Sequence, residues 1–95
     1  MIKVVAKSKV KTNELEKYKE LVKFLIDETR KEEGCISYDL FQDINDPSTL
    51  TFIEEWKDEE ALKRHMESKH FVKYVPMLGE FREGEGEVNI YKQIL

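Results

Sequence analysis

The chain has 95 residues, of which 16 are lysine or arginine and 20 are aspartate or glutamate, so its formal net charge is −4. The charges are interspersed and no basic patch alternates with aromatic residues, which excludes the electrostatic footprint of a nucleic-acid-binding protein. The length suits a single domain over residues 1–95, and a core of this size is marginal without a partner subunit.

In the first segment, from Ile2 to Val10, the apolar residues Ile2, Val4 and Ala6 alternate with Lys3, Val5 and Lys7. This period of two in a stretch rich in β-branched residues predicts a strand. This N-terminal stretch is too short and too charged for a signal peptide or a membrane span. Cys35 is the single cysteine, so no internal disulfide forms, and we interpret it as a small apolar strand residue. We therefore expect a cytoplasmic protein with no membrane or nucleic-acid partner.

A long amphipathic helix follows. Asn13 and Glu16 form a capping-box pattern, which predicts a helix start at Asn13. Gly34 predicts its end, because glycine is favoured just beyond a helix C-terminus. Apolar residues recur in between at spacings of three and four, and the buried stripe is expected to contain Leu15, Tyr18, Val22, Leu25 and Thr29.

The next two segments, Cys35 to Gln42 and Thr49 to Trp56, read as a hairpin joined by an Asn-Asp-Pro turn. In the first, Ile36, Tyr38 and Leu40 are expected to share a face. Both strands carry apolar residues on both faces, whereas a free antiparallel sheet is polar on its open side. A symmetric partner's sheet would cover the second face, so we expect a homodimer.

Asp58 is a predicted N-cap, and the helix after it has an apolar face made of Ala61, Leu62, His65 and Met66. A further helical or turn segment is expected to be broken up by Pro76 and Gly79. After an acidic loop, Val88 to Leu95 predicts the last strand. The order β-α-β-β-α-β predicts an α+β, ferredoxin-like fold with a four-stranded antiparallel sheet.

His65 is the principal candidate for chemistry, because its spacing from Ala61 and Leu62 turns its ring toward the sheet. An imidazole there can accept a substrate proton near neutral pH, or it can be a buried histidine bonded to a strand carbonyl. On one continuous helix His70 would lie about 140° away from His65, a poor chelating pair, so we predict no metal site. His70 is expected to cap the helix end instead.

Other residues are candidates for a substrate pocket. Trp56 and Phe52 share a strand face with Glu54, which either forms a salt bridge to the helices or is a carboxylate with a raised pKa. Asp39 is a second possible polar anchor. The remaining wall candidates are Tyr74 and Met66.

The chain resembles the antibiotic biosynthesis monooxygenase domain family over essentially its whole length. The residues that carry the resemblance are Glu33-Gly34-Cys35, Tyr38, Leu40, Glu55-Trp56-Lys57-Asp58, Ala61-Leu62, His65 and His70-Phe71. The resemblance implies a dimeric α+β barrel with a cavity in each subunit between sheet and helices. It also implies a monooxygenase that oxidises a small phenol or quinol with O2 without metal or flavin. In such an enzyme we expect His65 to be the base, because its spacing already turns the ring toward the sheet.

Two other functions stay open. One branch of the fold isomerises a phosphorylated signalling sugar, and it resembles this chain in the Lys57-Asp58-Glu59 run and in both histidines. The second open function is that of a non-enzymatic dimer that binds a small ligand. A third branch of the fold degrades haem, and this function is disfavoured. That branch has a tryptophan at the position of His65, a histidine near the position of Val75 and an asparagine in its first strand. This chain has histidine and valine at the first two positions and no asparagine before position 13.

Overall fold

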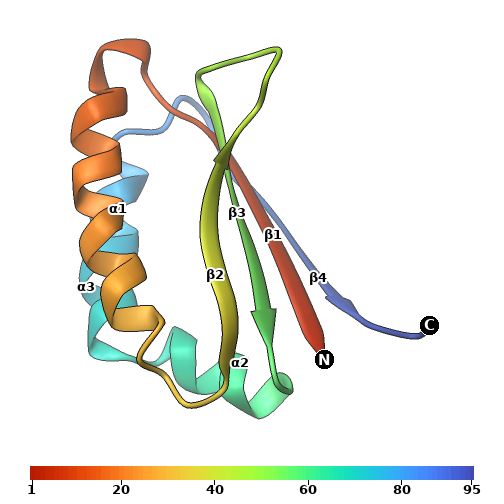
Figure 1. The fold of residues 1–95 in the computed structure, drawn as a ribbon. Coiled ribbons are helices and arrows are strands. Elements are labelled where there is room, and N and C mark those ends of the chain that lie inside the picture. Colours follow the sequence, from red (N-terminus) through yellow and green to blue (C-terminus); the bar gives the residue numbers. More distant parts are fainter.

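The computed structural model describes residues 1–95 as an antiparallel sheet with helices on one face (Figure 1). The strands are β1 (Ile2–Lys9), β2 (Cys35–Gln42), β3 (Thr49–Trp56) and β4 (Glu87–Lys92). The helices are α1 (Leu15–Thr29), α2 (Glu59–Met66) and α3 (Lys69–Gly79), with a short 3-10 turn, η1 (Thr12–Glu14), before α1. The strand order is β2-β3-β1-β4, all antiparallel, which confirms the ferredoxin-like α+β fold.

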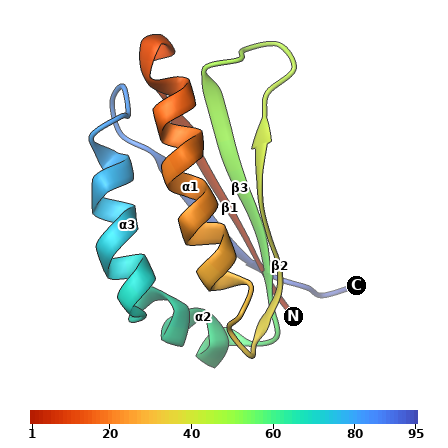
Figure 2. The same cartoon turned by 60° about the vertical axis from the view of Figure 1, so that its left-hand side comes forward.

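The core lies between the two layers. α1 and α3 run side by side over the sheet, and α2 lies across one end (Figures 1 and 2). None of these helices has the length and apolarity needed to cross a membrane. The buried apolar residues are Ile2, Val4, Val10, Tyr18, Val22, Leu25, Tyr38, Leu50, Phe52, Trp56, Ala61, Leu62 and Leu78.

The buried stripe of α1 is confirmed, but its start differs from the expectation. Tyr18, Val22, Leu25 and Thr29 are buried, as the spacing predicts, whereas Leu15 is only partly buried against the core. Asn13 lies inside η1, and no side chain caps either η1 or α1. A capping side chain needs extended backbone just before the helix, and here the chain is already turning. The predicted capping box is therefore wrong.

Gly34 does not end the first helix, which stops at Thr29. A Cβ atom at Gly34 would lie 2.2 Å from the Cβ of Ala61 in α2, closer than any real contact. The carbonyl of Gly34 also accepts a hydrogen bond from the amide of Lys57 at 2.9 Å. The glycine is needed because the start of β2 and the start of α2 approach each other so closely.

A β-bulge alters which side chains of β2 face the helices. Cys35 pairs with Trp56 and Ser37 pairs with Glu55, so an extra residue, Ile36, stands between them without its own partner. Ile36 is 55% exposed, whereas Tyr38 is buried. The prediction that Ile36 and Tyr38 share a face is therefore wrong, and Cys35 takes the inward position instead.

The region after Trp56 forms two helices with separate caps. The Asp58 side chain accepts from the amide of Ala61 at 2.8 Å, which confirms the predicted cap of α2. The Ser68 hydroxyl accepts from the amide of Phe71 and caps α3. Pro76 lies within α3 and does not interrupt it, contrary to expectation.

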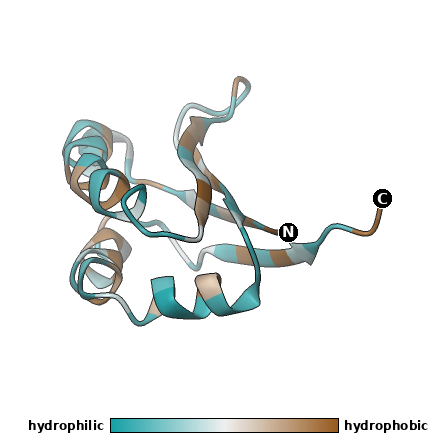
Figure 3. Ribbon diagram, turned by 60° about the horizontal axis from the view of Figure 1, so that its bottom comes forward, coloured by the Kyte–Doolittle hydropathy of each residue, from teal (hydrophilic) through white to brown (hydrophobic).

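The sheet face opposite the helices is uncovered in the single chain (Figure 2). Val5 pairs with Ile53 on this face, and Tyr91 pairs with Lys3, so apolar and charged side chains alternate over it. β4 ends at Lys92 rather than at Leu95. The residues beyond it extend away from the sheet and end in an exposed apolar tip (Figure 3).

Candidate functional site

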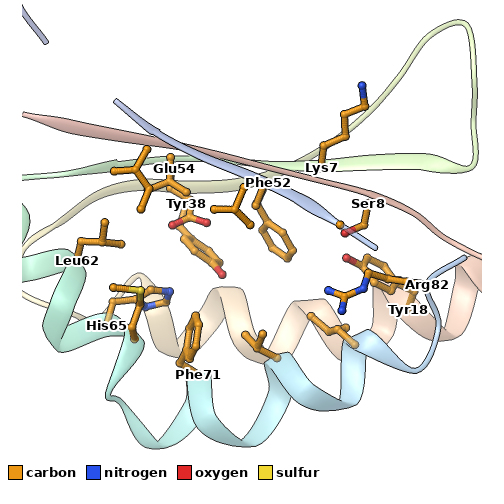
Figure 4. A pocket seen from close by; sticks show the side chains of 18 residues that line it. Lys7, Ser8, Tyr18, Tyr38, Phe52, Glu54, Leu62, His65, Phe71 and Arg82 are labelled. Atoms are coloured by element: carbon orange, nitrogen blue, oxygen red, sulfur yellow. The ribbon is translucent and has the colours of Figure 1, made fainter. Parts of the chain in front are cut away.

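A cavity of about 250 Å³ lies between the sheet and the helices (Figure 4). Its walls come from every strand and from all three α-helices, and 12 of its 18 lining residues are hydrophobic. The polar groups on its wall are few, as is usual for a small-molecule site. The lining residues that could act on a ligand are Ser8, Tyr18, Tyr38, Glu54, His65 and Arg82.

His65 is buried at the wall of this cavity with 1% of its surface exposed. Its ring lies over Trp56 at a centroid distance of 4.5 Å, with Tyr38 at 5.3 Å and Phe71 at 5.1 Å. The prediction that the ring turns toward the sheet is confirmed. Burial lowers the pKa of His65, and Glu32 only partly opposes this, so the imidazole is neutral near pH 7.

Glu32 orients the His65 ring. Its Oε2 atom lies 2.7 Å from Nδ1 of His65, so the histidine bonds a glutamate rather than a strand carbonyl. A carboxylate only accepts hydrogen bonds, so we assign the ring proton to Nδ1. In that tautomer Nε2 carries the free lone pair that a proton acceptor needs.

His70 joins the same carboxylate. Its Nε2 atom also lies 2.7 Å from Oε2 of Glu32. The angle expected for one continuous helix does not apply, because α2 ends at Met66 and His70 lies in the first turn of α3. It therefore does not cap a helix C-terminus, contrary to expectation.

The three side chains also have the composition of a metal site. The ligating atoms of Glu32, His65 and His70 lie within 4.8 Å of one another, and two imidazoles with one carboxylate suit a divalent transition metal. As they stand, both nitrogen-to-oxygen distances are those of hydrogen bonds. We therefore interpret the group as a hydrogen-bonded network around Glu32.

Glu54 is the second titratable group on the wall, with 5% of its surface exposed. It forms no salt bridge to the helices, and instead accepts a hydrogen bond from Nε1 of Trp56 at 2.9 Å. Burial raises the pKa of Glu54 to about 7, although the Trp56 bond opposes the shift and Glu32 adds to it. Of the two roles left open by the sequence, the structure favours the carboxylate with a raised pKa.

Tyr38 adds a neutral donor between these two groups. It lies opposite Glu54 in the β2–β3 ladder, and its hydroxyl points into the cavity (Figure 4). Burial raises the pKa of Tyr38 far above its usual value, so the hydroxyl keeps its proton.

Of the other residues predicted to form the cavity wall, two line the cavity and two do not. Phe52 and Met66 line the cavity, as expected. Trp56 is completely buried behind the wall, where it holds Glu54 and packs on His65. Tyr74 is not at the cavity and stacks on Phe24, at 6.2 Å between ring centroids.

The candidate Asp39 and the single cysteine, Cys35, both lie away from the cavity. Asp39 forms an ion pair with Arg30 at 2.6 Å, and it faces away from the helices, beside Ile53. Burial raises the pKa of the Cys35 thiol to about 11, with Glu32 and Glu54 adding to the effect. Cys35 is therefore an unreactive thiol, as its interpretation as a small apolar residue predicts.

Sequence reasoning missed Glu32, Tyr18 and Arg82. Glu32 lies in the turn between α1 and β2, where one glutamate among several gives no pattern. Tyr18 was expected only as part of the helix stripe. Arg82 follows α3 in an acidic segment whose path to the cavity depends on the tertiary fold.

Comparisons with known proteins agree with this fold. The family model described as antibiotic biosynthesis monooxygenase matches residues 1–77. YcnE of Bacillus subtilis, provisionally named a monooxygenase, is 39% identical over 75 residues, which is 79% of each chain.

Solved structures give the same result. A conserved protein from Methanosarcina mazei is 46% identical with a TM-score of 0.96, over 98% of this chain and 92% of that one. A crystal structure described as an antibiotic biosynthesis monooxygenase is 35% identical with a TM-score of 0.93, over the full length of both chains.

Proposed function

Because the chain belongs to the antibiotic biosynthesis monooxygenase family, we propose that it oxidises a small phenol or quinol with O2, without a metal or flavin cofactor. The observation that carries the proposal is the hydrogen bond of 2.7 Å between Glu32 and Nδ1 of His65. It leaves Nε2 of a buried, neutral histidine as the proton acceptor beside an apolar cavity.

In the first step His65 removes the proton of a substrate hydroxyl. The imidazolium that forms is stabilised by the Glu32 carboxylate, which also keeps the ring in one orientation. The Tyr38 hydroxyl can donate a hydrogen bond to the phenolate oxygen where the negative charge develops. The product of this step is an electron-rich anion in an environment with little water.

In the second step the anion reduces O2. Electrons pass from the ring to oxygen, and a C–O bond forms at a ring carbon that carried hydrogen. The O–O bond then breaks and one oxygen atom leaves as water. The oxygen atom that stays on the ring becomes a quinone carbonyl when the substrate is a phenol, and the hydroxyl of a hydroxyquinone when the substrate is a quinol. One substrate and one O2 thus give one oxygenated product and one water, with no external reductant.

Glu54 can act as the acid or base for the proton transfers that follow C–O bond formation. With a pKa of about 7 it is present in both protonation states at neutral pH. It lies on the cavity wall with His65, and can take the ring proton lost after C–O bond formation or supply the proton that completes water.

The test is oxygen consumption by chelator-treated protein on a panel of phenols and hydroquinones that each keep a free ring C–H. With isotopically labelled O2, we expect one labelled oxygen atom in each product molecule. Uptake that yields hydrogen peroxide and an unlabelled quinone would show an oxidase instead. Absence of uptake with any compound that the protein binds would favour a ligand-binding dimer.

The phosphosugar isomerase is the second candidate. It needs a cation for the phosphate, and the cavity does have Arg82 on its wall. However, Arg82 lies at the opposite end from His65 (Figure 4). This separation favours a longer aromatic substrate over a compact phosphosugar.

A further inference from the structure

The cavity has two polar ends. Glu54 and His65 lie at one end, and Ser8, Tyr18 and Arg82 at the other (Figure 4). Glu54 pairs with Val4 in the β1–β3 ladder, and Val4 lies four residues from Ser8 along the same strand. At the rise of a β-strand this separates the two ends by about 13 Å. The wall between them is mainly apolar.

The second end holds hydrogen-bond donors that have no partner within the protein. Arg30 and Arg64 form ion pairs with acids, whereas Arg82, the third arginine, has none within 4.0 Å. The glutamates near Arg82 in sequence do not reach its guanidinium. The hydroxyls of Ser8 and Tyr18 form no side-chain hydrogen bond either.

The hydroxyl of Tyr18 is a donor at all ordinary pH values. Burial raises the pKa of Tyr18 to about 12, and Arg82 only partly opposes this. Lys7 also borders this end, but its side chain points away from the cavity (Figure 4). The donors that face the cavity are therefore one guanidinium and two hydroxyls.

Gly86 keeps this end open. A Cβ atom there would lie 3.0 Å from Oγ of Ser8, 3.3 Å from the carbonyl of Lys7 and 3.6 Å from Nη1 of Arg82. Any side chain would therefore fill the space next to the Ser8 hydroxyl and the Arg82 guanidinium.

We propose that Ser8, Tyr18 and Arg82 bind an anionic group, a carboxylate or a phosphate, at the far end of the substrate from the hydroxyl that reacts. A planar guanidinium with two unpaired hydroxyls fits the oxygen atoms of such a group. The substrate is then an elongated aromatic acid with its anion roughly 10 Å from the reacting hydroxyl, since side chains take up part of the strand distance. The orientation, with the hydroxyl at His65, rests on the proposed function, whereas the anion site does not.

The experiment uses a matched set of probes of the right length. 4-Hydroxybiphenyl, 4′-hydroxybiphenyl-4-carboxylate and the corresponding 4-phosphonate are titrated into the full chain by calorimetry. We expect an anionic probe to bind about 10- to 100-fold more tightly than the neutral one, as charge-assisted hydrogen bonds would give. The preference should weaken with added salt, because Arg82 is exposed to solvent.

Variants locate the effect. Arg82→Gln should remove the preference for the anionic probes and leave binding of 4-hydroxybiphenyl unchanged. Arg64→Gln is the matched control, because that arginine pairs with Glu60 on the outside of α2 and is not at the cavity. It should keep the full preference.

Equal affinity for all three probes, or a preference that persists in Arg82→Gln, would overturn the anion site. A stronger preference for the carboxylate or for the phosphonate identifies the group, and either supports the site. Tight binding of the anionic probes without oxygen uptake on hydroquinones would leave this inference standing and contradict only the proposed oxidation.

Discussion

At the residue scale, burial moves the two titratable groups of the cavity in opposite directions. It lowers the pKa of His65 and raises that of Glu54, because in both cases the neutral form is favoured in a poorly solvated site. The cavity can therefore hold both a neutral base and a protonated acid near pH 7. This pairing is what proton transfer to and from a phenol requires.

The Glu54 carboxyl predicts a specific dependence of stability on pH. Its pKa is about 7 in the folded chain against an ordinary 4.5, so the folded state binds the proton more tightly and stability falls as pH rises from 4.5 through 7. Glu54→Gln keeps an acceptor for Trp56 and removes this titration. Between pH 5 and 8 the wild type should therefore lose about 2–3 kcal/mol of unfolding free energy relative to Glu54→Gln. Urea denaturation of both proteins at the two pH values measures this, and parallel profiles would contradict it.

How far the sequence predicts the site is clearest at these residues. The direction of His65 follows from helix periodicity, because the ring lies three and four residues from buried neighbours. Its partner Glu32 could not be found in this way, since 33 positions separate the two residues and only the tertiary fold joins them. Trp56 was placed on the correct strand face, but periodicity cannot tell whether a residue lines a cavity or lies behind its wall.

At the scale of secondary-structure elements, the predictions from the sequence were wrong at positions where a tertiary contact overrides the local sequence pattern. Gly34 was predicted to end a helix, and it is instead required where β2 and α2 touch. The β-bulge at Ile36 shifts the strand alternation by one residue, which no apolar pattern reveals. His70 was misplaced because Ser68 starts a new helix. The strands, helices and their order followed from local periodicity, which depends little on the rest of the chain.

The contact at Gly34 can be tested with a double-mutant cycle. Gly34→Ala should destabilise the chain by about 1–3 kcal/mol, because its Cβ would overlap the Cβ of Ala61. In the Ala61→Gly background the same change should be markedly less destabilising, since the overlapping atom is gone. Urea denaturation measures both effects. Equal losses of stability in the two backgrounds would show that β2 and α2 are not in close contact at Gly34 and Ala61.

The break between α2 and α3 brings His65 and His70 to the same carboxylate, that of Glu32. Because these three side chains form a hydrogen-bonded network, we expect neither stability nor activity to depend on a metal ion. Exhaustive chelation should leave the melting temperature and any oxygenase activity unchanged. The measurement is differential scanning calorimetry before and after dialysis against a chelator, with elemental analysis of the untreated protein. A fall in melting temperature that one particular metal restores would establish Glu32, His65 and His70 as ligands.

At the scale of the whole molecule, the uncovered sheet face favours a homodimer. Val5 and Ile53 pair on this face, and a chain of 95 residues has a limited core of its own. Multi-angle light scattering at micromolar concentration should give twice the chain mass of 11.3 kDa. Ile53→Lys should shift the protein toward monomer because it places a charge in the proposed interface. A monomeric wild type would contradict the barrel arrangement.

The proton acceptor is the central claim, and His65→Ala tests it most directly when turnover is expressed per folded molecule. If His65 is the base, turnover should fall by about 10²–10⁴-fold, the usual contribution of a positioned base. In the wild type the rate should fall only as the pH drops below 6.5, because the pKa of His65 is lowered from that value and only neutral imidazole accepts the proton. A variant that loses stability but turns over at the wild-type rate would contradict the assignment of His65 as the base and would show that its role is structural.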